Sequence, residues 1–472
     1  MDSLSRRHFL SRSTAVALGF TGLKASLAQG ATSAILDSIN NGQPSTDAES
    51  DIGFGPLLAD PDGILDLPSG FSYRIFSRVG ELMDDGLRVP GLHDAMGAFP
   101  FINDDGTVDP DRTVLVRNHE IEHAHRTTGA FEDPGALEQT DQSRIFDYGF
   151  GRPSRSGTTT VVYNTKTNTL EKQWLSLAGT ERNCAGGVTP QMTWLTCEET
   201  AATKNTRLEK DHGWVFEVPV TTTPQLADPK PITAMGRFMH EACCTDPRTG
   251  IVYMTEDRSD ALIYRYVPEV PEDLHAGGRL EALSITSAPK FDTRNWKEQT
   301  VQVGQRLGVR WLPLDEVESP DDDLRYRGYQ SGGARFARSE GMWWGNDSAY
   351  FACTTGGKAT AGQLWRLIPH PDGDVMGDVL ELFVEPNDPS VLEHADNITF
   401  SPWGDIVVCE DENKPPHLVG ITMKGELYRI ARNATNYSEF AGATFSPDGS
   451  TLFVNLQKMG WTLAITGPWK KS

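Results

Sequence analysis

The sequence is poor in cations, in cysteine and in long apolar stretches. Its 43 Lys and Arg side chains stand against 65 Asp and Glu, which gives a formal net charge of −22. So negative a field repels polyphosphates, so no nucleic-acid partner is expected, and an anionic substrate would need a strongly positive site. Gly and Pro are scattered without period and 38% of the residues are apolar, which excludes collagen-like, coiled-coil and wholly disordered chains. The composition is typical of a soluble, globular, acidic protein.

The apolar run near the N-terminus is too short to span a bilayer. It covers roughly residues 14–28 and contains Lys24, whereas a membrane span takes about 20 apolar residues. The sequence SRRHFL at residues 5–10 precedes it, and its paired arginines resemble a twin-arginine export signal. We therefore expect residues 1–28 to be a signal peptide recognised by the twin-arginine export machinery. The mature protein would be periplasmic or secreted and would keep no stable membrane anchor.

Six cysteines could pair in an exported chain, yet their settings argue against disulfides. Cys197, Cys353 and Cys409 lie in apolar strand-like runs, where a small buried side chain is the expected role, and the adjacent pair 243–244 points to opposite faces of a strand. Cys184 differs because Ala-Gly-Gly follows it. Such a flexible turn suits a thiolate held near a ligand or a metal.

Strand and turn signals dominate the chain, and helical spacing is scarce. Period-two or apolar runs such as residues 112–116 and 158–163 recur between clusters of Gly, Pro, Asn and Asp. Residues 29–60 are polar and rich in Gly, Ser and Asp, which predicts a flexible lead-in. Residues 61–472 are expected to form one domain, and residues 268–332 break its rhythm with charge and Pro, which predicts an inserted excursion.

One template recurs along this domain. Residues 184–198 and 396–410 both predict a strand, a turn containing Pro and a second strand ending in Cys-Glu, and residues 441–455 repeat the pattern. Looser copies begin at residues 94, 241 and 340. Each unit is typical of the inner hairpin of a propeller blade. Six units predict an all-β, six-bladed β-propeller with long inserted loops; a seven-bladed propeller and a large sandwich are the alternatives.

The repeat also predicts where acidic side chains gather. In an antiparallel hairpin the first residue of one strand lies beside the last residue of the next, and the blades of a propeller converge on a central channel. The neighbours expected on this geometry are Cys184 with Glu198, Glu241 with Glu256 and Asp257, Asp396 with Glu410 and Asp411, and Asp94 with residues 118–120. Such concentrated like charges cannot all stay ionised without cations. The alternative for each acid is a solvated position at a blade edge.

The residue types indicate which cations would fit. Many carboxylates and few histidines favour hard ions such as calcium, magnesium or manganese, while a thiolate favours a transition metal as well. The sequence therefore predicts a mixed cluster with Cys184 among its ligands.

Several motifs together resemble a known family. They are RNHE at 117–120, NCAGG at 183–187, CEE at 197–199, MGRFMHE at 235–241, RSEG at 338–341 and FSPDGSTLFVN at 445–455. Their combination is similar to the PhoX family of exported alkaline phosphatases, over about residues 65–457. The resemblance implies a six-bladed propeller that holds an iron pair and calcium ions in its channel and hydrolyses phosphomonoesters.

The resemblance also implies roles for single residues. By motif, Cys184 would supply the thiolate that binds iron, and Glu241 and Glu198 would be carboxylate ligands of iron or calcium. Glu120 and Glu340 would be further metal ligands. Asp396 and Glu410 would bind calcium. Asp257 joins the candidate ligands through its place beside Glu241 in the repeat. Arg338 would face the phosphate, where its fork suits the oxygens, and Asn118 could donate to the same oxygens. The alternative for Arg338 is a surface salt bridge, and the alternative for Asn118 is a turn-forming role.

Two other classes of function fit a propeller of this kind. A calcium-dependent lactonase or sugar-ester hydrolase would use one central calcium and would have no use for Cys184. A non-catalytic envelope propeller would bind a partner on its rim and use the acids for structural calcium only. The preferred interpretation is a monomeric phosphatase acting on a small-molecule phosphate ester, with iron and calcium as cofactors.

Overall fold

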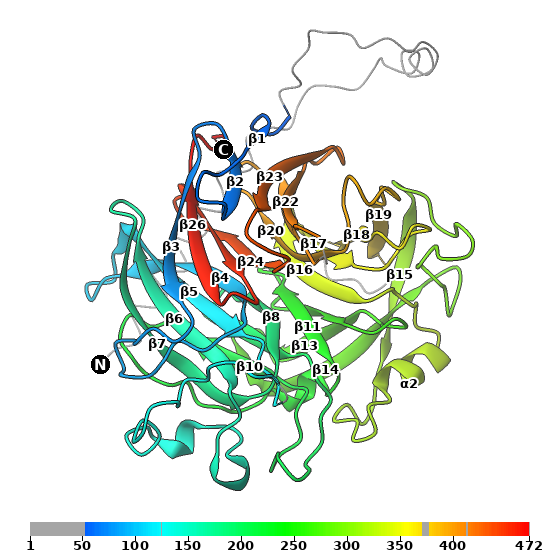
Figure 1. Ribbon diagram of the computed structural model, residues 1–472. Coiled ribbons are helices and arrows are strands. Elements are labelled where there is room, and N and C mark those ends of the chain that lie inside the picture. The colour runs from blue at the N-terminus through cyan, green and yellow to red at the C-terminus, as the bar shows by residue number, and fades with distance from the viewer. Residues whose placement is uncertain (1–51, 124, 371–376, 412–413, 472) are drawn as a thin grey trace. The chain divides into compact units, whose positions relative to one another are not determined.

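Strands dominate the computed structural model, which describes residues 52–123, 125–370, 377–411 and 414–471 (Figure 1). The all-β prediction is confirmed. The predicted signal peptide, residues 1–28, and most of the predicted lead-in lie outside the described residues, but β1 (Leu57–Leu58) falls inside that lead-in and pairs with β2 (Leu65–Pro68). Among the described residues, no helix has both the length and the apolar character that crossing a membrane requires.

The chain divides into two compact units. The larger comprises residues 52–101 and 109–472. The smaller comprises residues 1–51 and 102–108, of which the structure describes only 102–108. This short segment is a turn in which the amide of Gly106 donates to the carbonyl of Asn103 at 2.8 Å.

Three of the five sheets are short and antiparallel. The first contains, in spatial order, β4 (His93–Ile102), β5 (Val108–His119), β6 (Ser156–Asn164) and β7 (Thr169–Thr180). The second contains β8 (Asn183–Val188), β9 (Thr193–Glu198) and β10 (Val215–Pro219). The third contains β24 (Phe440–Phe445), β25 (Thr451–Leu456), β26 (Trp461–Thr466) and β3 (Ser72–Arg78), so it joins the two ends of the described chain.

The other two sheets are larger. One has the order β11 (His240–Thr245), β12 (Val252–Glu256), β13 (Tyr264–Val270), β14 (Asp273–Ile285), β15 (Arg306–Pro313), β19 (Val379–Val384), β18 (Gln363–Ile368), β17 (Ser348–Cys353) and β16 (Ser339–Gly345). The other has the order β1, β2, β23 (Leu427–Asn433), β22 (His417–Ile421), β21 (Ile406–Glu410) and β20 (Ala395–Phe400). Five sheets do not by themselves give six blades, and the blade number stays a prediction.

The predicted excursion at residues 268–332 is more regular than its sequence indicates. It contains all of β14, which pairs with β13, then β15, and then the short helix α2 (Leu324–Gln330). The segment looked irregular because β13 and β14 meet in an exposed polar turn, where Val270 pairs with Asp273. An exposed hairpin needs no apolar alternation, so the pattern that reveals a half-buried strand is missing there.

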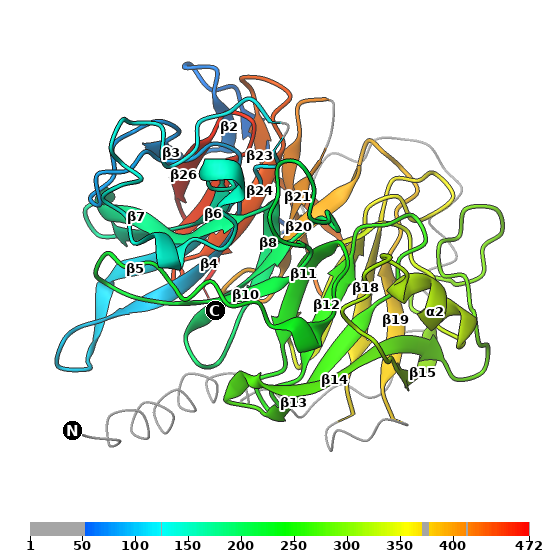
Figure 2. The same cartoon turned by 90° about the horizontal axis from the view of Figure 1, so that it is seen from below.

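Each predicted repeat unit forms a hairpin, from β4–β5 through β8–β9, β11–β12, β16–β17, β20–β21 and β24–β25. The first strands of these hairpins gather around the middle of the larger unit, where β8 contacts β11, β11 contacts β16, β16 contacts β20 and β20 contacts β24 (Figures 1 and 2). Five of these first strands start with a register shift, for example between His240 and Cys243. A bulge of this kind re-aims one side chain of the strand.

Candidate metal centre

A cavity of about 150 Å³ lies where the inner hairpins end. Its lining consists of nine carboxyl side chains, one thiol, two guanidinium groups and one amide: Asp94, Glu120, Glu199, Glu241, Asp257, Glu340, Asp396, Asp411, Glu439, Cys184, Arg182, Arg338 and Gln457. We call this the acid cavity. Among the described residues of the lining, most side chains are acidic and two are cationic, so the cavity carries a large excess of negative charge when its acids are ionised.

Two equivalent positions of the hairpins supply most of the lining. The first position is the second residue of the inner strand, and it holds Asp94, Cys184, Glu241, Glu340 and Asp396, with Ala441 in the sixth hairpin. The second position directly follows the second strand, and it holds Glu120, Glu199, Asp257, Asp411 and Gln457, with Thr354 in the remaining hairpin. The sequence repeat thus places one ligand-type side chain at nearly every position around the cavity.

The same backbone hydrogen bond fixes the second position in all six hairpins. The amide of the second-position residue donates to the carbonyl two residues before the first position, at distances from 2.9 to 3.3 Å. The pairs are Glu120 with Leu92, Glu199 with Arg182, Asp257 with Met239, Thr354 with Arg338, Asp411 with His394 and Gln457 with Glu439. Each hairpin therefore presents its two cavity residues on the same backbone frame.

The structure brings most of the predicted site residues to the acid cavity. They are Glu120, Cys184, Glu241, Asp257, Arg338, Glu340 and Asp396. Three further predictions, Glu198, Glu410 and Asn118, lie outside it and have other partners. The sequence did not single out Glu199, Glu439, Arg182 and Gln457 as site residues, and it placed Asp94 and Asp411 among the gathered acids without a ligand role. The signal for two of them was present, because an acid directly follows Glu198 and Glu410 in the sequence.

Glu198 is a buried structural carboxylate and corrects one prediction. Its Oε1 accepts from the amide of Glu181 at 2.8 Å and from Nδ1 of His212 at 2.7 Å. Its Oε2 accepts from the amides of Gly213 at 2.8 Å and Trp214 at 3.1 Å. Successive strand residues point to opposite sides, so Glu198 faces away from the cavity and the next residue, Glu199, faces into it.

Glu410 repeats this arrangement in another hairpin and corrects a second prediction. It accepts from Nη1 of Arg429 at 2.9 Å and from the amide and Nδ1 of His417 at 2.9 and 3.1 Å. Although burial opposes the effect, the hydrogen bond from His417 and the charge of Arg429 lower the pKa of Glu410. The carboxylate is satisfied within its own sheet, and Asp411 occupies the place in the cavity.

Asn118 positions the strand that carries the thiol. Its Nδ2 donates to the carbonyls of Cys184 at 3.1 Å and Ala185 at 2.8 Å. Its Oδ1 accepts from Nε1 of Trp194 and Oγ1 of Thr196, both at 2.9 Å. All four hydrogen-bonding capacities of the amide are used, so in this structure Asn118 holds β8 in place, and its donation to a phosphate stays a prediction.

The thiol of Cys184 lies among carboxylates. Its Sγ is 2.9 Å from Oε2 of Glu241, and one ligand atom each of Cys184, Glu199 and Glu241 lies within 4.8 Å of the others. Burial raises the pKa of all three groups well above the ordinary values, and the charge of Glu241 raises the pKa of Cys184 and of Glu199 further. A buried thiolate and two carboxylates at this spacing fit a metal ion, which would favour the deprotonated ligands.

The remaining acids show the same effect of burial and like charge. Burial raises the pKa of Asp94 and of Glu340 well above the ordinary values, and the neighbouring carboxylates Glu120 and Asp257 add to it. Burial also raises the pKa of Asp396 to about 7. Ionised acids this close need cations to balance them. The donor set therefore fits cations along the whole cavity, beyond the group at Cys184.

The two arginines each connect two acids of the cavity. Arg182 pairs with Glu120 through Nε at 2.8 Å and with Glu199 through Nη2 at 3.0 Å. Arg338 pairs with both oxygens of Asp257, at 3.0 and 3.1 Å, and with Glu340. Although burial opposes the effect, the neighbouring carboxylates raise the pKa of both arginines, so both remain charged.

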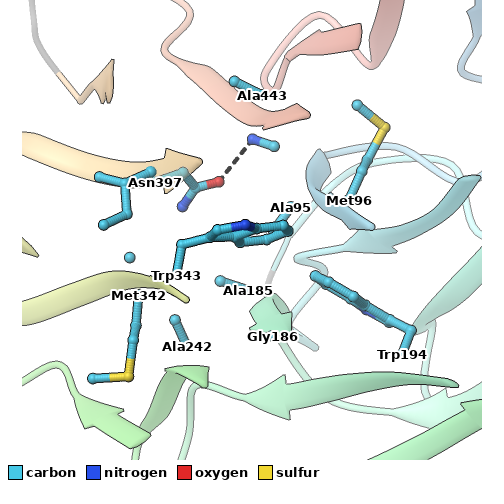
Figure 3. A pocket seen from close by; sticks show the side chains of 13 residues that line it. Ala95, Met96, Ala185, Gly186, Trp194, Ala242, Met342, Trp343, Asn397 and Ala443 are labelled. Atoms are coloured by element: carbon cyan, nitrogen blue, oxygen red, sulfur yellow. Dashed lines mark hydrogen bonds between the residues drawn. The ribbon is translucent and has the colours of Figure 1, made fainter. Parts of the chain in front are cut away.

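A ring of mostly small residues lies next to the acid cavity and narrows the channel there (Figure 3). We call this ring the closed level. The residue after each first position lines it: Ala95, Ala185, Ala242, Gly341, Asn397 and Gly442. Figure 3 shows the ring of Trp343 at the middle of this level, and the space left is about 20 Å³, room for about one water molecule. Asn397 ties the level to the cavity, because it accepts from the amide of Gly442 at 2.7 Å and donates to Asp396 at 3.0 Å. A substrate cannot pass through this level.

The strands surround a buried cavity that is lined by carboxyl groups and one thiol. This arrangement defines a propeller-like protein with a central site that can bind cations. The family profile described as alkaline phosphatase PhoX matches residues 52–460. The chain therefore belongs to the PhoX family of alkaline phosphatases, and the predicted enzyme class, a phosphatase, is confirmed.

Solved structures support the fold. PhoX from Pseudomonas fluorescens, in complex with vanadate, a transition state analogue, has a TM-score of 0.64 and 17% identity, and the match covers 87% of this chain and 97% of that one. A gluconolactonase from Xanthomonas campestris matches with a TM-score of 0.33 and 11% identity over 88% of this chain and 98% of that one. A similarity that weak carries no argument for the lactonase alternative. No curated protein sequence matches the chain.

Proposed function

We propose that this protein is an exported, metal-dependent phosphatase that hydrolyses phosphomonoesters in the acid cavity. The observation that carries the proposal is the lining itself, in which nine carboxyl groups and one thiol surround about 150 Å³ together with two arginines. Membership of the PhoX family supports the reaction class. The P. fluorescens relative binds vanadate, a transition state analogue, which supports a tetrahedral oxyanion as the ligand of this cavity too.

The donor set supports iron and calcium as the cofactors. Cys184, Glu199 and Glu241 would hold iron, because thiolate prefers a transition metal, and the carboxylates at the other positions would hold calcium, because oxygen ligands alone suit a hard ion. When bound, these cations supply Lewis acidity that neutralises phosphoryl oxygens and lowers the pKa of a nucleophilic water. The protein's share is to fix these ligands on strand ends and to keep the far level of the channel closed with Trp343.

Arg338 would bind the phosphate group of the substrate. Its side chain keeps 34% of its surface exposed while it pairs with Asp257 and Glu340, so it can be reached from solvent. A guanidinium fork matches two phosphate oxygens and holds the ester for in-line attack. The proposed substrate is a small-molecule phosphate ester, which would approach from the side of the cavity opposite the closed level.

The proposed propeller has six blades. The nine-stranded sheet divides at β15, since β11–β14 and β16–β19 are each four consecutive antiparallel strands and β15 pairs with both β14 and β19. With the nine-stranded sheet divided in this way, the described strands form six antiparallel groups. The sixfold hydrogen bond of the second position supports the same number.

Export by the twin-arginine route is part of the proposal. The SRRHFL sequence at residues 5–10 supports it, and the mature enzyme would act as a monomer in the periplasm or outside the cell. Folded export suits an enzyme whose proposed ligands come from five separate hairpins, because these ligands come together only once the chain has folded.

Metal analysis together with turnover tests the proposed function. The full chain is expressed with residues 1–28 intact, the exported protein is purified, and its metals are quantified. We expect iron and calcium in the protein, and release of phosphate from an aryl phosphomonoester at alkaline pH. Stoichiometric calcium without iron, combined with no release of phosphate, would contradict the proposal and favour the lactonase alternative.

A further inference from the structure

Arg182 and Arg338 occupy the same place in two hairpins. Each lies two residues before the first position, at Cys184 and Glu340, and each has a left-handed backbone, with φ of 52° and 50°. The carbonyl of each accepts the amide of its own second-position residue, in both cases at 2.9 Å. Leu92 and His394, at the same place in two further hairpins, have φ of 44° and 51°, so the left-handed backbone belongs to this hairpin position, and at two of these places it carries an arginine that lines the acid cavity.

The two side chains also have the same setting. Both connect two cavity acids, and both keep about a third of their surface exposed, 31% for Arg182 and 34% for Arg338. Within the described residues, Nη1 of neither guanidinium makes a hydrogen bond. Each arginine therefore offers a donor to a ligand that enters the cavity, even before it releases a carboxylate.

The two arginines precede the two strands that flank β11. Arg182 leads into β8 and Arg338 leads into β16, and both strands contact β11, which carries Glu241. Arg182 pairs directly with Glu199, one of the three residues at the candidate iron position. A tetrahedral oxyanion seated over Cys184, Glu199 and Glu241 would thus have one guanidinium on each side.

We propose that Arg182 is a second phosphate-binding residue, which holds the phosphoryl group of the substrate together with Arg338. This inference rests on the proposed function and deepens it. Arg182 pairs with Glu120 and Glu199. Once cations balance these carboxylates, the guanidinium turns to the oxyanion. Two forks on opposite sides fix the orientation of a phosphoryl group, whose charge is spread over three equatorial oxygens in the transition state.

The pairing predicts selectivity among oxyanions. A phosphoryl group of a monoester carries two charges and three terminal oxygens, which is enough to serve both guanidinium groups and the cations. A diester has one charge and two terminal oxygens, so it leaves one arginine without a partner in a cavity where an unpaired charge is costly. We therefore assign the second arginine a role in selecting monoesters.

Vanadate binding to the metal-loaded protein tests the proposal without turnover. Isothermal titration compares the wild type with Arg182→Gln, Arg182→Lys and Arg338→Gln. We expect Arg182→Gln to weaken vanadate binding about ten- to a hundredfold, the loss expected for a hydrogen bond to a charged group, and Arg182→Lys to weaken it less. The matched control is Arg429→Gln, because Arg429 has similar exposure, 27%, and also pairs with a buried acid, Glu410, outside the cavity. It should bind vanadate within about twofold of wild type.

A purely structural role for Arg182 gives a different result. If Arg182 were only a counter-ion, Arg182→Gln would lower the melting temperature of the metal-free protein and leave vanadate affinity per bound metal unchanged, and that outcome overturns the proposal. If Arg182→Gln binds less metal than the wild type, the Arg182→Lys variant provides the test, because lysine keeps the positive charge and lacks the forked guanidinium. Wild-type vanadate affinity in Arg182→Lys would then overturn the proposal. A wild type that binds vanadate and fails to hydrolyse any monoester would refute the proposed function, while the titration still reports on Arg182.

Discussion

A single sulfur distinguishes the acid cavity at the residue scale. All six cysteines of the chain are buried and free of disulfides, yet only Cys184 lines the cavity, with a carboxylate oxygen 2.9 Å away. Cys353 lies on β17 and belongs to the same apolar cluster as Cys184, but it is not among the residues that line the cavity, and burial raises the pKa of its thiol to about 12. Two thiols with equal burial thus have different chemical surroundings, which makes them a matched pair for substitution.

Cys184→Ser should remove iron and lower kcat/KM by more than about a hundredfold, since losing a direct ligand costs at least as much as losing a supporting one. Cys353→Ser should keep both metal content and activity and lower only the free energy of unfolding, by about 1 to 3 kcal/mol, because a hydroxyl replaces a buried apolar sulfur. Metal analysis, steady-state kinetics and urea denaturation provide the measurements. Equal losses of iron in the two variants would refute the special place of Cys184.

The neighbouring residues Glu198 and Glu199 should separate stability from metal binding. Although burial opposes the effect, the charge of Glu198 and the hydrogen bond with Asp147 raise the pKa of His212 to about 10. Glu198→Gln therefore leaves a buried charge poorly balanced and should cost about 3 to 5 kcal/mol of stability. Glu199→Gln should lose metal with little loss of stability. Denaturation midpoints and metal content check both variants, and metal loss confined to Glu198→Gln would contradict the geometry.

The residue-by-residue outcome shows what a repeat can and cannot predict. The first position was predictable because template copies align Cys184, Glu241 and Asp396 without further knowledge. The second position was missed by one residue in two hairpins, since a bulge shifts the register by an amount that sequence spacing does not reveal. Arg182 carries no signal of its own, and only its equivalence to Arg338 identifies it.

At the scale of elements, close contact between inner strands shapes the cavity. A Cβ placed on Gly341 of β16 would lie 2.3 Å from the carbonyl oxygen of Asp396 on β20, and one on Gly442 would lie 2.5 Å from that of Asp94. Real Cβ atoms do not approach backbone this closely, so glycine is required for the strands to meet. The strand ends, and with them the acids of neighbouring hairpins, come together because of it.

Gly341→Ala should separate β16 from β20 and displace Glu340 relative to Asp396. We expect a loss of about 1 to 3 kcal/mol of stability, as overpacking typically costs, together with weaker metal retention. Gly308→Ala on β15 is the control, because the nearest side-chain atom would lie 3.6 Å from its Cβ, and its stability should change by less than about 0.5 kcal/mol. Urea denaturation midpoints and metal content of the two variants are the measurements. Equal losses in Gly341→Ala and Gly308→Ala would mean that the contact between β16 and β20 does not shape the site.

The elements themselves were predictable to the extent that they are buried. Inner hairpins carry apolar residues on both faces and a Pro or Gly turn, so all six were found. The segment 268–332 was misread because β14 begins in an exposed polar turn, and the pairing of β15 with both β14 and β19 links strands far apart in sequence. No local pattern predicts a pairing of that kind.

On the scale of the whole molecule, the acid cavity makes folding depend on cations. Nine carboxyl groups and a thiol share about 150 Å³ with two arginines, so the metal-free protein must either protonate several acids or bear their repulsion. Burial raises the pKa of Asp396 from 3.8 to about 7, and it raises the pKa values of Asp94, Glu241 and Glu340 well above their ordinary values. Proton binding and metal binding therefore compete for the same oxygens.

This competition predicts opposite pH dependences for the two forms of the protein. Between pH 4 and 7 the folded metal-free protein binds more protons than the unfolded chain, because Asp396 titrates near 7 in the fold and near 3.8 when unfolded. Its free energy of unfolding should therefore fall as the pH rises, by about 1.4 kcal/mol per pH unit for each such carboxyl.

In the metal-loaded protein the same carboxylates are deprotonated in the fold, so stability should rise with pH over that range. Urea midpoints of chelated and metal-loaded protein, measured at several pH values between 4 and 8, give the two slopes. Asp396→Asn should flatten the slope of the metal-free form, since an amide does not titrate, and should stabilise that form near neutral pH because one source of repulsion is gone. Parallel slopes in the chelated and loaded proteins would show that the acids of the cavity do not hold cations.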